Sequence, residues 1–284
     1  MSDHPRPEMS PADHAELALL LEVASTPKPG NVDRRRDHGD LHFEHFLTGA
    51  VGARPGLDRA EGAAPLGDAF ERSVRGMCQQ SGGNTQFGCL LLLVPLIRAT
   101  ATNRLSPDGL ERVVSATTVD DAAAFYRAFE HVDVAVGDPP EDAPALDVRR
   151  GADAVPTLRE RGLTLEDVMA TSADRDGNAA EWTSGFERTF AAAETVLKDD
   201  GPVTDRLARA FLDLLADRPD TLVAVEHGEE RARAVSRRAA EVRGNPNAVE
   251  RLAEEFVADG INPGTTADLT AATAFVALER GVTL

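Results

Sequence analysis

The chain has 284 residues, a length that suits one large domain better than two. Its 48 acidic side chains outnumber the 30 basic ones and give a formal charge of -18, which excludes nucleic-acid binding through a basic surface. Hydrophobic residues make up 42% of the chain, which is enough for a core and excludes a wholly disordered protein. The longest apolar run, 89–95, is too short to cross a membrane, and the polar start of the chain predicts a cytoplasmic protein.

The basic residues are distributed unevenly between the two types. Lys28 and Lys198 are the only lysines, so the other 28 of the 30 basic residues are arginines. An acidic surface that is nearly free of lysine suits a cytoplasm full of salt, where charge repulsion is screened. We therefore expect a halophilic protein that unfolds in low salt. An acidic protein from a GC-rich genome, which also favours arginine, is the alternative.

The first expected helix begins near the N-terminus of the chain. Ser10 is a suitable N-cap, and Pro11 fits the first helical position, where its missing N–H costs nothing. Four apolar residues have the spacing of one buried helical face: Leu17, Leu20, Leu21 and Ala24. The helix must end before Thr26, because two prolines and a glycine follow within residues 26–30.

Helical periodicity dominates the rest of the chain. Further helices are expected at 42–51, 66–80, 84–102, 108–116, 119–131, 165–172, 178–198, 203–216, 228–242, 248–258 and 265–280. Residues 53–65 are expected to form a loop, and 132–156 to be irregular. Neither a series of alternating segments nor a β-α-β pattern occurs. The sequence therefore predicts an all-α, single-domain multi-helix bundle over residues 1–284, with the apolar helix 84–102 buried at its centre and 1–10 as a flexible tail.

A Pro- and Gly-rich segment after the first helix, residues 26–33, has catalytic potential. Its prolines fix the backbone, and Gly30 permits a tight turn. Lys28 is one of only two lysines, and Arg34 and His38 add positive charge in an acidic chain. This cluster of cations predicts a phosphate-binding site. A rigid connector between helices with a solvated run of charges is the alternative.

Two further segments combine glycine, hydroxyl or amide side chains and the start of a helix. In the first, Gly83 precedes Asn84 and Thr85; in the second, Gly264 precedes Thr265 and Thr266. Free N–H groups and a partial positive charge at a helix N-terminus suit phosphate. Ordinary helix capping is the alternative for both segments.

Acidic residues near these segments are candidates for metal binding or proton transfer. Asp268 lies about one turn inside the last helix, where its carboxylate could hold a Mg²⁺ ion that neutralises a polyphosphate. Trp182 is expected in the core, with Asp176 or Glu181 at the edge of a pocket. The chain contains no P-loop, dinucleotide-binding or nucleophile-elbow motif, which argues against those enzyme classes.

Together the three segments resemble the triphosphoribosyl-dephospho-CoA synthase family. Residues 26–33, His38–Asp40 and Phe46–Leu47 are similar to its TPKPGLVD…HxD…FL signature. Residues 83–88 are similar to its GxNTHKG motif, and 262–269 to its SPGGSADLL motif. The sequence differs from the family where Gln86 and Phe87 replace the His-Lys pair.

The resemblance implies an all-α enzyme that joins the triphosphoribosyl group of ATP to 3'-dephospho-CoA and releases adenine. In such a ribosyl transfer a 2'-hydroxyl attacks C1' of the ATP ribose, which needs a base for the hydroxyl and stabilisation of the leaving adenine. The implied partners are the small molecules ATP and dephospho-CoA, with Mg²⁺ as cofactor, and a homodimer is one candidate oligomeric state. A related transferase or phosphohydrolase with another phosphorylated substrate, or a non-catalytic nucleotide-binding protein, is the alternative.

The resemblance also implies roles for individual residues. Asp33, Asp40 and Asp268 are the catalytic candidates, and Asp33 and Asp268 are also the metal candidates. The implied phosphate- and nucleotide-binding residues are Lys28, Gly30, Arg34, His38, Gly83, Asn84, Thr85, Gly264, Thr265 and Thr266. The resemblance does not distinguish which carboxylate is the general base.

Overall fold

The computed structural model describes residues 9–139 and 143–284, which form fifteen α-helices, two short 3-10 helices and no strand. The all-α fold expected from the sequence is therefore confirmed. The helices are α1 Pro11–Ala24, α2 Phe43–Glu61, α3 Leu66–Met77, α4 Phe87–Ala101, α5 Pro107–Ser115, α6 Val119–Ala128, η1 Pro144–Leu146, η2 Val148–Ala154, α7 Val155–Arg161, α8 Leu165–Ser172, α9 Gly177–Thr183, α10 Glu187–Lys198, α11 Val203–Asp217, α12 Thr221–His227, α13 Glu229–Val242, α14 Pro246–Ala258 and α15 Gly264–Glu279.

Helix α1 starts as expected but buries a different face. Ser10 and Asp13 form a reciprocal capping box, and Pro11 takes the first helical position. The predicted tail contributes this cap, and its residues 1–8 lie outside the described part. The fully buried side is built from smaller residues: Ala12, Ala15, Ala18, Leu19 and Val23. The expected stripe of leucines is only partly buried, because the alanine side is the one that lets neighbouring helices approach closely.

Two helices form the centre of the fold. In α4 the run Leu90–Ile97 is buried throughout, as the apolar pattern predicted, and the helix continues through Pro95. Helix α15 is also buried along most of its length, and its alanines and threonines allow α1, α4 and α10 to pack on it. The sequence predicted one buried central helix, whereas the structure has two.

The expected loop 53–65 is instead mostly helical, because α2 continues to Glu61. Its glycines are packing residues: a β-carbon on Gly52 would lie 2.3 Å from the carbonyl oxygen of Gly76 on α3. One turn later, a β-carbon on Gly56 would lie 2.1 Å from Oγ of Ser73. These glycines therefore bring the α2 and α3 backbones together.

Three other element predictions need correction. The single helix expected over 178–198 is divided into α9 and α10, because Gly185 and Phe186 both adopt positive φ angles of 64°. Helix α7 and helix α12 were not predicted, and the 132–156 stretch contains η1 and η2. Helix α12 is short and begins with Asp220 as a side-chain N-cap.

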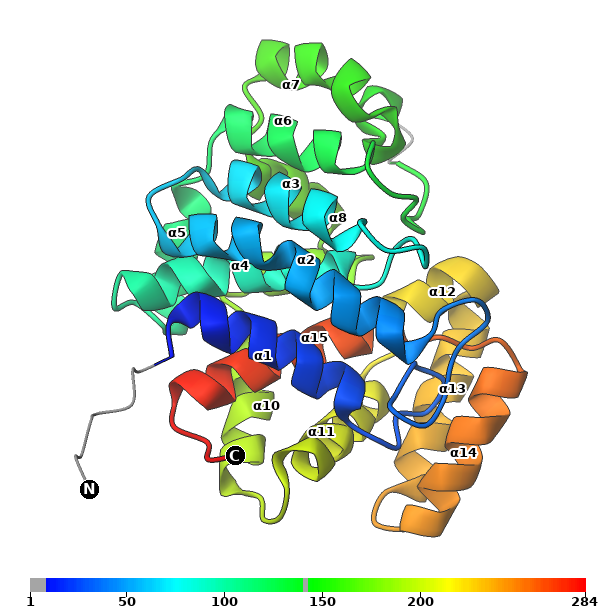
Figure 1. Cartoon of the computed structure of the whole chain (residues 1–284). Helices are drawn as coiled ribbons and strands as arrows, with labels where there is room; N and C mark the ends of the chain where they lie inside the picture. Colours follow the sequence, from blue (N-terminus) through cyan, green and yellow to red (C-terminus); the bar gives the residue numbers. More distant parts are fainter. Residues whose placement is uncertain (1–8, 140–142) are drawn as a thin grey trace, which may run out of the picture.

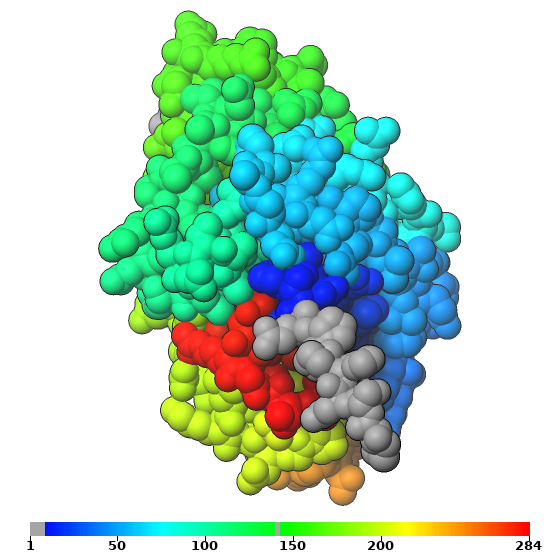
Figure 2. Space-filling view, turned by 60° about the vertical axis from the view of Figure 1, so that its left-hand side comes forward, coloured from blue at the N-terminus to red at the C-terminus, as the bar shows by residue number. Residues whose placement is uncertain are grey.

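Most of the helices form a stack, and a smaller group that includes α12, α13 and α14 lies beside it (Figure 1). Helices α7, α6, α3 and α2 contact one another in succession, and α1 and α15 lie side by side below them. In Figure 2 the end of α15 (red) reaches the surface beside α1 (dark blue). A second apolar cluster packs α11, α12, α13, α14 and the start of α15 together, and it includes the fully buried Phe211 and Phe256. None of the described helices has both the length and the apolar character needed to cross a membrane. The single-domain organisation stays a prediction.

Candidate active site

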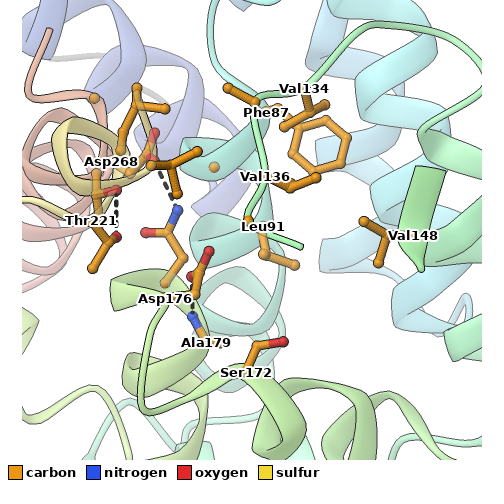
Figure 3. A pocket seen from close by; sticks show the side chains of 18 of the residues that line it. Phe87, Leu91, Val134, Val136, Val148, Ser172, Asp176, Ala179, Thr221 and Asp268 are labelled. Carbon is orange, nitrogen blue, oxygen red and sulfur yellow. Dashed lines mark hydrogen bonds between the residues drawn. The ribbon is translucent and has the colours of Figure 1, made fainter. Parts of the chain in front are cut away.

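A cleft of about 500 Å³ lies where the N-terminal ends of α4, α12 and α15 meet α8, α9 and the extended segment 132–139. Its volume is in the range of small-molecule sites. Polar side chains gather on one side and apolar side chains on the other (Figure 3). We call these the polar side and the apolar side of the cleft.

Asp268 on α15 is the central group of the polar side. Asn178 donates a hydrogen bond to its Oδ2 at 2.8 Å, and the Cys89 thiol donates to its Oδ1 at 3.2 Å. A β-carbon on Gly88 would lie 2.0 Å from Oδ2 of Asp268, so any larger residue at that position of α4 would displace the carboxylate. Residues from α4, α9 and α15 thus fix one carboxylate in the cleft.

The environment of Asp268 favours its protonated form. Burial, with a smaller contribution from the nearby Asp220 and Glu22, raises the pKa of this carboxyl to about 7, although the hydrogen bonds from Asn178 and Cys89 oppose the shift. A carboxyl with a pKa near 7 is suited to accept or donate a proton at neutral pH.

Asp176 is the second carboxylate of this region, at the N-terminus of α9. Its Oδ1 accepts a hydrogen bond from the backbone N–H of Ala179 at 2.8 Å, so it is also the N-cap of the helix. Burial raises the pKa of Asp176 above its ordinary value. Figure 3 shows Asp176 and Asp268 on the same side of the cleft. Asn178, which donates to Asp268, follows Asp176 by two residues on α9.

Hydroxyl groups at the helix starts complete the polar side. Thr221 and Thr265 are hydrogen-bonded through their hydroxyls at 3.0 Å, and Thr221 also accepts from the N–H of Gly177 at 3.1 Å. Thr266 faces away from the cleft, since its N–H and hydroxyl both donate to Asp220 at 2.7 Å. Of the predicted residues of the last motif, Gly264, Thr265 and Asp268 line the cleft and Thr266 supports it from behind.

The second motif contributes Asn84 and Thr85 to the cleft lining. Helix α4 begins three residues later than the motif suggested, and the N–H of its first residue, Phe87, donates to Oδ1 of Asn84 at 3.1 Å. Gly83 is exposed, has a φ of 70° and does not line the cleft.

Lys28 lies behind the cleft and is completely buried. Its ammonium is ion-paired with Glu22 and donates to Oδ1 of Asn31 at 2.8 Å. Glu22 and Asn31 line the cleft, and Asn31 donates to Asn262 of the last motif at 2.9 Å. The first and third motifs therefore meet as expected, but the cation reaches the cleft only through its partners.

Asp33 is buried inside the Pro-Gly loop and does not line the cleft. Oδ2 accepts from the Thr26 hydroxyl at 2.8 Å and from Arg36 at 3.0 Å, and Oδ1 accepts from the N–H of Arg35 at 2.8 Å. This satisfied carboxylate holds the loop together. Asp33 and Asp268 therefore do not form the expected metal pair, and the described residues include no group of three or more His, Cys, Asp or Glu side chains that could hold a metal ion.

The other predicted residues of the first segment also lie outside the cleft lining. Gly30 packs against the C-terminal motif, because a β-carbon there would lie 2.3 Å from the carbonyl oxygen of Ile261. Arg34 donates to the Ala24 carbonyl at 2.8 Å, and Asp40 is exposed. His38 is partly buried, and burial lowers its pKa.

The charge of the cleft is opposite to the phosphate cradle expected from the sequence. One cation, Arg175, is among the described lining residues. Eight carboxylates line the cleft: Glu22, Asp133, Asp138, Asp147, Asp176, Glu226, Glu229 and Asp268. A polyphosphate bound here needs counterions, because the side chains alone repel it.

Sequence reasoning missed several lining residues of the polar side. Glu22 stands at the start of the first candidate segment but was assigned no role, and Asn178 belongs to no recognised motif. Thr221 lies in a pair, Asp220–Thr221, that matches the family's DTNLxHRGG segment only loosely. A weak signal existed for Asn178 and Asp176, since both lie near the only tryptophan, whose Trp182 Nε1 donates to the Leu91 carbonyl at 3.3 Å. Only the tertiary packing of α9 against α4 places them beside Asp268.

The helical fold and its cleft with a buried carboxylate define the class of the protein as an all-α protein with a small-molecule site. Residues 8–283 match the model of the ATP:dephospho-CoA triphosphoribosyl transferase (CitG) family, and the chain belongs to this family. It is also similar to the crystal structure of a proposed triphosphoribosyl-dephospho-CoA synthase from Archaeoglobus fulgidus, with a TM-score of 0.71 and 26% identity over 85% of this chain and 100% of that one. None of the curated proteins compared with the chain matches it.

Proposed function

We propose that the chain transfers the triphosphoribosyl group of ATP to dephospho-CoA with release of adenine. Family membership and the similar synthase structure support this activity. The observation on which the proposal rests is Asp268, a carboxyl with a pKa of about 7 that three helices hold in a cleft large enough for a small-molecule ligand.

The reaction forms one bond and breaks one bond at C1' of the ATP ribose. The oxygen of the acceptor's 2'-hydroxyl bonds to C1', and the C1'–N9 bond breaks with its electron pair going to adenine. The hydroxyl proton must go to a base, and we assign this role to ionised Asp268. The transition state is cation-like at C1', so carboxylates nearby stabilise it.

Asp176 is the proposed acid for the leaving adenine. Burial raises its pKa above the ordinary value, which favours the form that carries a proton. Donation of that proton to adenine as the C1'–N9 bond breaks leaves Asp176 ionised and adenine neutral. The two carboxyls then divide base and acid roles on the same side of the cleft.

Mg²⁺ is proposed as part of the substrate, entering with the triphosphate. Mg²⁺ keeps several waters and is usually held by substrate phosphates plus one or two carboxylates. Asp33 is not available for this role because its oxygens are occupied inside the loop. The proposed ATP binding therefore depends on Mg²⁺ and other cations to offset the acidic lining.

The activity is tested by incubating the purified protein with ATP, Mg²⁺ and dephospho-CoA in molar KCl and measuring free adenine. We expect adenine and a triphosphoribosylated acceptor in equal amounts, and a loss of about 10²-fold or more in rate for Asp268→Asn. Absence of adenine with every CoA-like acceptor contradicts the proposal. Thermal stabilisation by a nucleotide other than ATP would then favour the related transferase or phosphohydrolase, and binding without turnover would favour the non-catalytic protein.

Halophily, a cytoplasmic location and a homodimer are proposals as well. The 48 acidic residues and the near absence of lysine support the first. The surface gives the homodimer little support, because the described residues expose few large hydrophobic side chains: Met9, Val51, Val225 and Leu284. Light scattering at molar salt measures the oligomeric state directly.

A further inference from the structure

The apolar side of the cleft has no task in the reaction described above. Phe87, Leu91, Val134, Val136 and Val148 point toward one another there, opposite Asp268 and Thr221 (Figure 3). Two of the five belong to α4, two to the extended segment 132–139 and one to η2. An apolar surface that lines a cavity stabilises a ligand that brings apolar groups to it.

The α4 part of this surface is rigid. The ring of Phe87 meets Phe70 edge-on with the centroids 5.1 Å apart and Phe129 with the centroids 4.8 Å apart. Phe87 is 5% exposed and Leu91 6% exposed, so each presents a small fixed area to the cleft. Phe87 also occupies the position of the Lys in the resembled family motif, so the apolar character is a property of this chain.

The segment 132–139 supplies the opposite wall. Val134 and Val136 are half-buried, whereas Asp133 and Ala135, which also line the cleft, are exposed, and Figure 3 shows the two valines on the apolar side. Asp138 fixes the far end, since its backbone carbonyl accepts from Arg175 and its carboxylate from Arg149, both at 3.1 Å. Part of the apolar surface of both valines therefore stays accessible in the cleft, because no protein group covers it fully.

We propose that the apolar side binds the pantetheine-type arm of the acceptor, an extended chain of methylene, dimethyl and amide groups. The inference rests on the proposed function, which supplies an acceptor with a nucleotide end and a long uncharged end. The polar side suits the ribose and phosphates, and the aliphatic groups beyond it suit the arm. One ligand that spans both sides explains why a single cleft has two kinds of surface.

The adenine base is a poorer match for the apolar side. The ring of Phe87 is engaged by Phe70 and Phe129, and the hydroxyl of Tyr126, which also lines the cleft, already donates to the Leu146 carbonyl at 2.7 Å. The purine edge carries hydrogen-bonding nitrogens that cost free energy when they are buried without partners. Aliphatic side chains cannot form hydrogen bonds with these nitrogens, whereas they match methylene and dimethyl groups.

The test is equilibrium binding of dephospho-CoA and of ADP, which lacks the arm, without ATP and therefore without turnover. Dephospho-CoA is ADP with the pantetheine arm attached to the terminal phosphate. We expect the wild-type protein to bind dephospho-CoA at least tenfold more tightly than ADP. The double variant Val136→Ser/Val148→Ser should lose about tenfold in dephospho-CoA affinity and less than about twofold in ADP affinity. Val51→Ser, at an exposed valine on α2, is the matched control and should change neither.

Two outcomes overturn the proposal. If dephospho-CoA binds no more tightly than ADP, or does not bind, the arm contributes no affinity in the cleft. This comparison needs no variant. Equal losses of ADP and dephospho-CoA affinity in the double variant place the base on the apolar side. Failure of the proposed function is distinguishable, because arm-dependent binding without adenine release in the complete reaction would retain the subsite and contradict the transferase activity.

Discussion

Asn178 donates a hydrogen bond from Nδ2 to Oδ2 of Asp268 at 2.8 Å, and its own Oδ1 has no hydrogen-bond partner in the described part of the chain. A half-turn of the amide would present Oδ1 to Asp268 without breaking a bond of that oxygen. Asn178 can therefore donate to an ionised Asp268 or accept from a protonated one. This adaptability suits a carboxyl that changes its protonation state during a reaction.

Replacing Asp268 by asparagine separates its chemical role from its effect on stability. The folded state raises the pKa of Asp268 to about 7 from its ordinary value of 3.8, so between these values it retains a proton that the unfolded chain releases. Wild-type stability therefore falls as pH rises through this window. In Asp268→Asn the new amide can donate a hydrogen bond to Oδ1 of a flipped Asn178. The free energy of unfolding of this variant should gain on the order of 2 kcal/mol relative to wild type between pH 5 and pH 8, while the variant loses turnover.

Denaturant unfolding of both proteins at pH 5 and pH 8, in the same molar salt, measures this difference. Asp153→Asn, at an exposed carboxylate of η2, is the matched control and should show the same change with pH as wild type. An Asp268→Asn variant whose advantage does not grow with pH would mean that Asp268 does not titrate between pH 5 and pH 8 with the raised pKa.

Gly88 should be essential to the shape of the cleft. A β-carbon at this position would lie 2.0 Å from Oδ2 of Asp268 and 2.5 Å from Nδ2 of Asn178. Gly88→Ala should lower the free energy of unfolding by about 1–3 kcal/mol and reduce adenine release in the protein that remains folded, because both polar groups must move. At Gly62 the nearest atoms would be 3.6 Å and 3.7 Å away, so Gly62→Ala should leave the rate unchanged. Equal rates for the two variants would show that the Asp268 position tolerates displacement.

The buried pair Lys28 and Glu22 predicts a stability defect where the family resemblance predicts a phosphate-binding defect. Lys28→Met leaves the Glu22 carboxyl buried without its cation and should cost about 3–5 kcal/mol. The double variant Lys28→Met/Glu22→Gln should recover much of this loss, because no uncompensated charge remains. Thermal unfolding of the two single variants and the double variant measures the coupling. A Lys28→Met protein of normal stability with a raised KM for ATP would instead support direct contact between Lys28 and phosphate.

The helices were predictable from sequence where the local signals agree. Ser10 and Pro11 predicted the start of α1 to the residue, and the unbroken apolar run predicted the burial of α4. Signals that depend on a neighbour were misread. Gly52 and Gly56 look like helix breakers in the sequence, and only the closeness of α3 shows that they are packing residues.

The same limit applies to the site. The motifs correctly predicted that Asn84, Thr265 and Asp268 lie at one cleft. Each of them lies at or near the N-terminus of a helix, and these N-termini meet at the cleft. They could not show that Lys28 is neutralised by Glu22, a residue six positions earlier, since burial decides whether a lysine meets a ligand or a carboxylate.

The acidic lining of the cleft predicts a strong salt dependence of substrate binding. Glu226, Glu229 and Asp133 are exposed at the cleft, and Arg175 is the one cation among the described lining residues. A triphosphate approaching them is repelled over about 10 Å at 0.1 M salt but only over about 3 Å at 1 M. The KM for ATP should therefore fall by about tenfold or more between 0.1 M and 2 M KCl at constant free Mg²⁺, over the range in which the protein stays folded.

Neutralising the exposed carboxylates separates this local effect from salt-dependent folding. Glu226→Gln/Glu229→Gln should lower the KM for ATP at low salt and flatten its dependence on KCl, because the variant carries two fewer charges at the cleft. Glu254→Gln, at an exposed site on α14, should retain the wild-type dependence. Circular dichroism at each salt concentration shows which measurements refer to folded protein. An unchanged salt slope in the double variant would mean that KCl acts through the whole protein, as a general halophilic requirement, and that the lining charges do not control the entry of ATP.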